Sequence, residues 1–205
     1  MDGNNRWSKK NSKSTFEAYQ HGANKLMNLS QYIFSNTDVK YISAFALSRN
    51  NLNRSIQKIN TIKKVLGLSL NKIEEKKLNF NIKFIGEFNF LENQIINKIK
   101  LLNQSNKFKK TLYIFLNYGG REDIEKASVH RFKKKGFDNY LYTKNIPDPD
   151  LLIRSGGYSR LSNFMLYQIA FTELFFLKKL WPDLTNKDLN NIFNKFKSIK
   201  RNFGK

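Results

Sequence analysis

Four polar segments of this 205-residue chain combine arginine with glycine, asparagine or serine. Small residues let backbone N–H groups come close to an anion, and the planar guanidinium of arginine matches phosphate oxygens. Each segment alone is also typical of an ordinary turn. Their recurrence favours a site for a phosphorylated ligand. The segments are Asp2-Gly3-Asn4-Asn5-Arg6, Ser48-Arg49-Asn50-Asn51-Leu52-Asn53-Arg54, Asn117-Tyr118-Gly119-Gly120-Arg121 and Arg154-Ser155-Gly156-Gly157-Tyr158-Ser159-Arg160-Leu161-Ser162.

One carboxylate stands out because its surroundings in the sequence are apolar. Glu173 lies within Ile169-Ala170-Phe171-Thr172-Glu173-Leu174-Phe175-Phe176. Burying a carboxylate is costly unless a cation or a metal ion neutralises it. Two interpretations stay open on the residues alone: a structural ion pair with a nearby arginine, or a ligand of a metal ion.

The composition limits the partners and the chemistry. The chain carries 37 Lys and Arg against 16 Asp and Glu, a net charge of +21, which favours nucleic acid, anionic lipid headgroups or phosphorylated small molecules. The basic residues are spread along the whole chain without an arginine-rich arm or an aromatic RNA-binding signature, which argues against nucleic acid. Cysteine is absent and histidine occurs twice, which excludes disulfide scaffolds, thiol catalysis and histidine-based metal cages.

Known sequence signatures exclude further classes. There is no Walker phosphate loop, no Rossmann glycine fingerprint and no Gly-x-Ser-x-Gly nucleophile elbow. No apolar run is long enough to span a bilayer, and no signal peptide is found at the start. We therefore expect a cytoplasmic protein.

Helical and strand patterns alternate along the chain, and these elements must position the polar segments. Apolar spacing and short buried runs predict helices over 19–34, 55–78 with a break near Gly67, 91–102, 121–134 and from Thr185, and strands over 41–46, 81–86, 111–116 and 151–153. Thr185 and Asp188 have capping-box spacing. The alternation predicts one α/β domain, 1–205, with a mostly parallel central sheet flanked by helices. Ligands bind at the carboxyl ends of such strands, where the polar segments fall.

Taken together, these motifs resemble the cis-prenyltransferase family, which includes undecaprenyl diphosphate synthase. The opening motif is Met1-Asp2-Gly3-Asn4-x-Arg6-Trp7, and the middle motif is Asn117-Tyr118-Gly119-Gly120-Arg121. The third block runs from Pro147-Asp148-Pro149-Asp150 through Arg154-Ser155-Gly156-Gly157 to Arg160-Leu161-Ser162-Asn163-Phe164. Gln168-Ile169-Ala170-Phe171-Thr172-Glu173-Leu174 and Trp181-Pro182-Asp183 follow in family order.

The resemblance implies the family's fold and an activity. Isopentenyl diphosphate would be condensed with an allylic diphosphate in Z configuration, releasing diphosphate and building a polyprenyl diphosphate, a lipid carrier precursor. The same resemblance implies Mg²⁺ as the cofactor, a homodimer, and a transient contact with the membrane surface when the product is released.

The resemblance also implies roles for individual residues. Asp2 would be the catalytic carboxylate and a magnesium ligand, with Glu173 as a second metal ligand. Asn51 would act in catalysis from the active-site loop, next to Ser48. The allylic diphosphate would contact the opening motif and Arg54, and isopentenyl diphosphate would contact the third block. The predicted substrate-binding residues are Gly3, Asn4, Asn5, Arg6, Trp7, Ser48, Arg54, Arg154, Arg160 and Ser162.

Departures from the family pattern support a rival hypothesis. The family has other residues at the positions of Asn5, Thr15, Tyr19, Asn50, Leu52 and Ser159, and the apolar strand that precedes its Asp-Gly motif is missing here. A non-catalytic or degenerate homologue that acts as a binding subunit is therefore the alternative. A basic nucleic-acid-binding protein is a further alternative that rests on charge alone.

Two residues of the strand 111–116 are predicted to differ in role. Leu112 and Phe115 are three positions apart, so strand alternation places them on opposite faces of the sheet. The resemblance favours Leu112 as a residue that closes the far end of the product tunnel. Phe115 is then expected to pack in the core on the other face.

Overall fold

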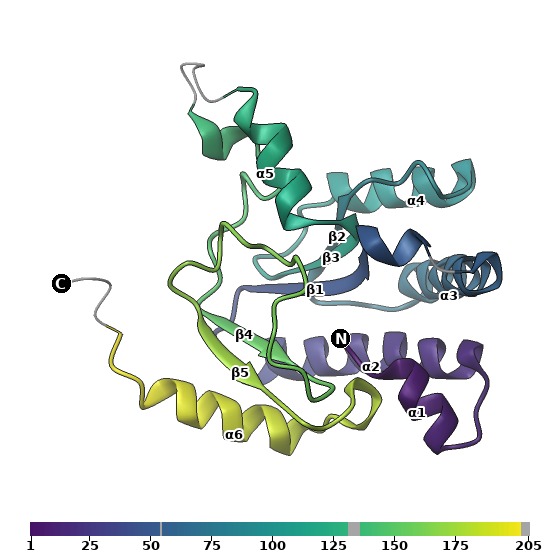
Figure 1. The fold of residues 1–205 in the computed structure, drawn as a ribbon, viewed down its shortest axis with the longest axis horizontal. Coiled ribbons are helices and arrows are strands. Elements are labelled where there is room, and N and C mark those ends of the chain that lie inside the picture. Colours follow the sequence, from purple (N-terminus) through teal and green to yellow (C-terminus); the bar gives the residue numbers. More distant parts are fainter. Residues whose placement is uncertain (54, 131–135, 202–205) are drawn as a thin grey trace.

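The computed structural model describes residues 1–53, 55–130 and 136–201, and in them helices and strands alternate as the sequence predicts (Figure 1). The helices are α1 (Asn4–Lys10), α2 (Thr15–Asn36), α3 (Ile56–Glu75), α4 (Asn93–Gln104), α5 (Gly120–Ser128) and α6 (Asn186–Lys197). The strands are β1 (Tyr41–Ser48), β2 (Asn81–Gly86), β3 (Thr111–Tyr118), β4 (Leu151–Arg154) and β5 (Glu173–Phe176). Short 3₁₀ turns cover Arg49–Asn53, Phe137–Tyr140 and Trp181–Asp183.

The predicted fold class is confirmed, since every strand pair of the described residues is parallel and helices flank the strands. The first sheet has the order β1-β3-β2, and β4 pairs only with β5 in the second. Within the described residues, no strand of the first sheet pairs with a strand of the second. Within that part of the chain, the β1 edge turned away from β3 and the β4 edge turned away from β5 have no strand partner. Residues of both sheets line one cavity.

Strand β3 lies at the centre of the first sheet, and all its residues are buried. Helices cover both faces of a parallel sheet in α/β folds, which gives central strands continuous apolar sequences. Leu112 packs in the cluster with α2, α3 and α4, whereas Phe115 packs on the other face with Tyr118 and Met165. The predicted opposite placement of Leu112 and Phe115 is confirmed.

Local signals explain where helices α2 and α6 begin. Thr185 Oγ1 accepts from the Asp188 N–H, and Asp188 accepts from the Thr185 N–H, so the predicted capping box of α6 is confirmed. A second capping box, Ser14 with Glu17, starts α2 four residues before the predicted Tyr19. Helix α3 continues through Gly67, because packing against α2 and α4 offsets the roughly 1 kcal/mol that a helical glycine costs.

Two further elements differ from the predictions. Helix α5 ends at Ser128, earlier than predicted, and residues 131–135 lie outside the described residues. The segment around Glu173 forms strand β5, for which no strand was predicted. No helix in the described ranges has both the length and the apolar composition needed to cross a bilayer.

Candidate active site

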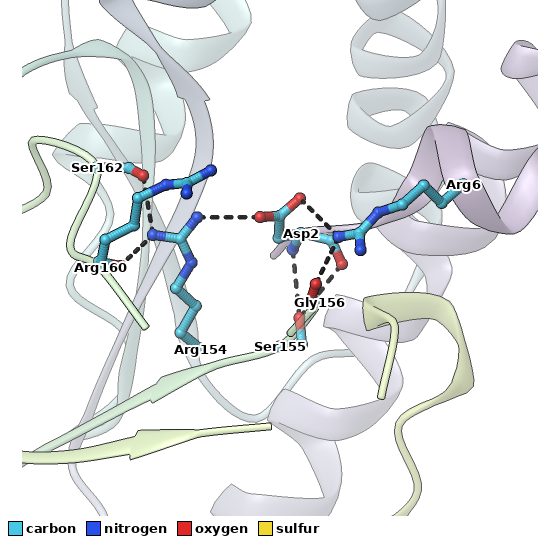
Figure 2. A network of polar contacts seen from close by, with 7 residues as sticks. All are labelled: Asp2, Arg6, Arg154, Ser155, Gly156, Arg160 and Ser162. Atoms are coloured by element: carbon cyan, nitrogen blue, oxygen red, sulfur yellow. Dashed lines mark hydrogen bonds and ion pairs between the residues drawn. The ribbon is translucent and has the colours of Figure 1, made fainter. Parts of the chain in front are cut away.

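Asp2 is held at the carboxyl end of β4 by its backbone (Figure 2). Its N–H donates to Ser155 Oγ at 3.2 Å, and its carbonyl oxygen accepts from the Trp181 N–H at 2.9 Å. These bonds join three segments that are far apart in the sequence. The position of Asp2 is thus fixed without using its carboxylate.

The Asp2 carboxylate lies between two arginines, which reach it from opposite sides in Figure 2. Arg154 Nη2 is 3.0 Å from Asp2 Oδ2, and Arg6 Nη2 is 3.8 Å from Asp2 Oδ1. Arg6 Nη2 also donates to the carbonyl oxygen of Gly156 at 2.6 Å. The sequence-predicted first and last polar segments therefore form one charged cluster.

Arg154 is the most enclosed arginine of this cluster, with 13% of its side chain exposed. Its second terminal nitrogen, Nη1, donates to Ser162 Oγ at 2.8 Å and to the carbonyl oxygen of Arg160. Low exposure strengthens the attraction between a guanidinium and an anion because less water screens it. Arg154 therefore orients the Asp2 carboxylate and holds the segment that carries Arg160 and Ser162.

Two glycines allow the chain segments to come this close. Gly156 has φ +96°, and a Cβ there would lie 2.9 Å from both Arg6 Nη2 and Asp2 Cβ. Gly3 has φ +103°, and a Cβ there would lie 2.7 Å from the Leu180 side chain. A side chain at either position would be strained by the backbone and would displace its neighbours.

The charged cluster borders a large apolar cavity of about 1440 Å³. Its walls come from β1 and β4, which face each other, and from side chains of α2, α3 and α6. Consecutive residues of β1 and of β4 line it, so it runs along the strand edges that have no partner in the described residues. The predicted site residues that line it are Asp2, Gly3, Asn4, Asn5, Arg6, Ser48, Asn51, Arg154, Arg160 and Ser162.

Three predicted site residues are not among these lining residues. Trp7 donates from Nε1 to Asp183 Oδ1 at 2.7 Å and stacks on His21, so it joins α1 to its neighbours. Glu173 pairs in register with Leu151, at the other end of β4 from Arg154 and Asp2. Arg54 lies outside the described residues.

The middle motif, residues 117–121, does not line the cavity but hydrogen-bonds to the turn that follows Ser162. The Gly120 N–H donates to the carbonyl oxygen of Asn163, and the Arg121 N–H donates to Asn163 Oδ1, both at 2.8 Å. Asn163 follows Ser162 directly, and both have positive φ. The motif thus fixes the turn that presents Ser162.

A buried polar network continues from this motif. The Tyr118 hydroxyl donates to Asp123 Oδ2 at 3.0 Å, and the Tyr142 N–H donates to Asp123 Oδ1 at 2.8 Å. Burial raises the pKa of the Asp123 carboxyl and that of the Tyr118 hydroxyl. The network fastens α5 to β3 and to the chain that leads into β4.

Tyr158 is a site residue that the sequence reasoning missed. Its ring lies among Arg6, Arg154 and Arg160, with guanidinium carbons 4.9, 5.8 and 4.0 Å from the ring centroid. The sequence did carry a signal for this role, since Tyr158 lies between Arg154 and Arg160 in one polar segment. The ring belongs to the charged cluster because all three cations contact it.

Comparisons with known proteins agree with this geometry. A family model described as "Putative undecaprenyl diphosphate synthase" matches residues 1–204. An isoprenyl transferase of Rickettsia typhi is 39% identical, over 100% of this chain and 95% of its own length. A tritrans,polycis-undecaprenyl-diphosphate synthase (geranylgeranyl-diphosphate specific) of Pyrobaculum aerophilum is 33% identical, over 100% of this chain and 93% of its own length.

A solved structure shows the same fold. The crystal structure of lavandulyl diphosphate synthase from Lavandula x intermedia, in complex with dimethylallyl diphosphate, matches with a TM-score of 0.86 and 29% identity. The match covers 100% of this chain and 95% of that chain. The motifs, the fold and the family match over nearly every residue agree, and this chain belongs to the undecaprenyl diphosphate synthase family of cis-prenyltransferases.

Proposed function

We propose that this chain condenses isopentenyl diphosphate with an allylic prenyl diphosphate in Z configuration, building a polyprenyl diphosphate and releasing diphosphate. Prenyl transfer is the activity of its family. The observation that carries the proposal is the position of the Asp2–arginine cluster beside a large apolar cavity. A prenyl diphosphate has a polyanionic head and an apolar tail, which match these two parts of the site.

The arginines supply the electrostatic part of the reaction. Negative charge builds up on the leaving diphosphate as the allylic carbon–oxygen bond breaks. Preorganised donors aimed at such charge are commonly the largest single contribution to catalysis. Arg6, Arg154 and Arg160 are already gathered there, so little reorganisation is needed when charge develops.

The residues of the cluster fit Mg²⁺ that is held jointly with a substrate. Mg²⁺ commonly takes one or two carboxylates and completes its shell with phosphate oxygens and water. Asp2 offers a carboxylate that is 35% exposed. In the described ranges no three acidic or histidine side chains gather into a metal site, so substrate oxygens would complete the shell. Bound Mg²⁺ would neutralise diphosphate charge.

Glu173 is a weaker candidate for the same ion. It is level with Leu151, three residues before Arg154 on the neighbouring strand, which corresponds to about 10 Å along the sheet. Asp2 contacts side chains at and beyond Arg154. The proposal therefore assigns the ion to Asp2, and a metal role for Glu173 stays a prediction.

Incorporation of radiolabelled isopentenyl diphosphate, with an allylic starter and Mg²⁺, tests the proposal. We expect labelled product that becomes soluble in organic solvent after dephosphorylation and that is lost when the starter is omitted. Binding of both diphosphates without incorporation would favour the non-catalytic alternative.

Product length tests the assignment of the cavity. Leu112, predicted to close the tunnel, is not among the lining residues, whereas Ile114 and Leu116 on the same strand are. Ile114→Ala is therefore expected to lengthen the products, at a stability cost of about 2–5 kcal/mol. Phe115→Ala, on the opposite face, should lower stability without lengthening them. Thin-layer chromatography of dephosphorylated products separates the two outcomes, and longer products from Phe115→Ala alone would reject the assignment.

A homodimer is the proposed assembly, and an exposed apolar face supports it. Leu174 and Phe176 alternate along β5, so they share one face, and they are 42% and 37% exposed. We expect wild-type protein to sediment as a dimer and Leu174→Lys to shift it toward monomer. Leu101→Lys on α4, where the leucine is 68% exposed, is the matched control and should stay dimeric. A wild-type monomer at micromolar concentration would contradict the proposal.

Contact with a membrane surface is proposed for product release. The product tail is apolar, and the net charge of +21 favours anionic headgroups, which attract basic residues near the surface.

A further inference from the structure

The three arginines of the cluster differ in what holds them. Arg154 and Arg6 both pair with Asp2, and Arg6 also donates to Gly156. For the Arg160 guanidinium, the described contacts include no carboxylate; they include the Tyr158 ring, whose centroid is 4.0 Å from the guanidinium carbon. Among the described residues of the cluster, Arg160 is therefore the arginine whose charge is not neutralised by a carboxylate and can pair with a bound anion.

Like charges this close repel one another, and a long side chain without a partner loses little by turning into solvent. An aromatic face counters both effects because its electron density attracts a guanidinium within about 6 Å. Tyr158 meets this condition for all three arginines at once. It also follows Gly157, whose φ of +82° turns the chain back toward the cluster.

We infer that Tyr158 is a positioning residue that holds Arg160, and with it Arg6 and Arg154, in the arrangement that binds a diphosphate group. The inference rests on the proposed function, since it concerns the same charged cluster. It assigns to Tyr158 a role in affinity and leaves the bond-breaking step to other groups.

The chemistry of the contact predicts which substitutions preserve it. The ring face attracts the cations and the hydroxyl is not needed, so Tyr158→Phe should retain the effect. A hydroxyl that bound the phosphate directly would fail this test. Because Tyr158 acts mainly through Arg160, its removal should matter little once Arg160 is gone.

Titration calorimetry with inorganic diphosphate on the full chain tests these expectations. Each exposed cation–π contact corresponds to roughly a two- to five-fold effect. Tyr158→Ala is therefore expected to weaken diphosphate binding about two- to five-fold, and Tyr158→Phe by less than about two-fold. In an Arg160→Ala background, Tyr158→Ala should add less than about two-fold. Tyr167→Ala is the control, since Tyr167 is similarly exposed at 45% against 40% for Tyr158.

A kinetic measurement separates positioning from folding. Tyr158→Ala should raise KM for isopentenyl diphosphate with little change in kcat, and its far-ultraviolet circular dichroism should match the wild type. If Tyr158→Ala binds diphosphate as tightly as the wild type does, the inference is overturned and the proposed function still stands. Wild-type protein that binds no diphosphate would overturn both.

Discussion

Asp2→Ala is expected to lower turnover by at least about two to three orders of magnitude while leaving the fold intact. Removing one preorganised charged contact has effects of this size on kcat. The Asp2 carboxylate bridges Arg154 and Arg6 and is the proposed magnesium ligand. The backbone bonds of Asp2 to Ser155 and Trp181 do not involve the carboxylate, so the segment keeps its position.

Initial rates of isopentenyl diphosphate incorporation, with both substrates saturating, measure this effect, and thermal unfolding checks the fold. Asp2→Asn is the matched variant because it keeps the size of the side chain and removes the charge. It should lose nearly as much activity as Asp2→Ala. Turnover close to wild type in Asp2→Asn would show that the charge is not required and would reject the catalytic role.

Arg154→Ala has the second largest expected effect. Its guanidinium contacts Asp2, Ser162 and the Arg160 backbone. A hydrogen bond to a charged group contributes about 1.5–3 kcal/mol, which corresponds to roughly ten-fold or more. KM for isopentenyl diphosphate should therefore rise at least about ten-fold, more than KM for the allylic substrate. Since Asp2 loses its closest cation, kcat should fall as well.

Arg160→Ala provides the comparison, because Arg160 has no described contact with Asp2. It should raise KM for isopentenyl diphosphate by a similar factor and change kcat less than Arg154→Ala does. Arg121→Ala, on α5 and outside the cavity lining, is the control and should leave both constants near wild type. Equal increases in KM for both substrates would reject separate diphosphate sites.

Local interactions made much of this protein predictable from its sequence. The capping box at Thr185 and Asp188 involves side chains three residues apart, so the start of α6 could be predicted directly. The opposite faces of Leu112 and Phe115 follow from the two-residue period of a strand. The charged cluster was also predictable, because the carboxyl ends of parallel strands gather their loops.

Other features depend on contacts between distant parts of the chain. Trp7 belongs to the opening motif, yet Asp183, 176 positions away, draws its indole N–H away from the cavity. Glu173 was assigned to a metal site by motif alone, and the pairing of β5 with β4 sets its distance from Asp2. The middle motif has the composition of an anion-binding turn, but the N–H groups of Gly120 and Arg121 donate to Asn163 instead.

The sequence by itself determined the alternation of elements, the family motifs and the residues that carry charge to the strand ends. Only the tertiary structure decided the order in which the strands pair, that a cavity of about 1440 Å³ lies between β1 and β4, and that Tyr158 sits among three arginines. Strand pairing and cation–π stacking depend on how segments are placed relative to one another. Packing of the whole chain sets this placement, and short-range spacing in the sequence does not encode it.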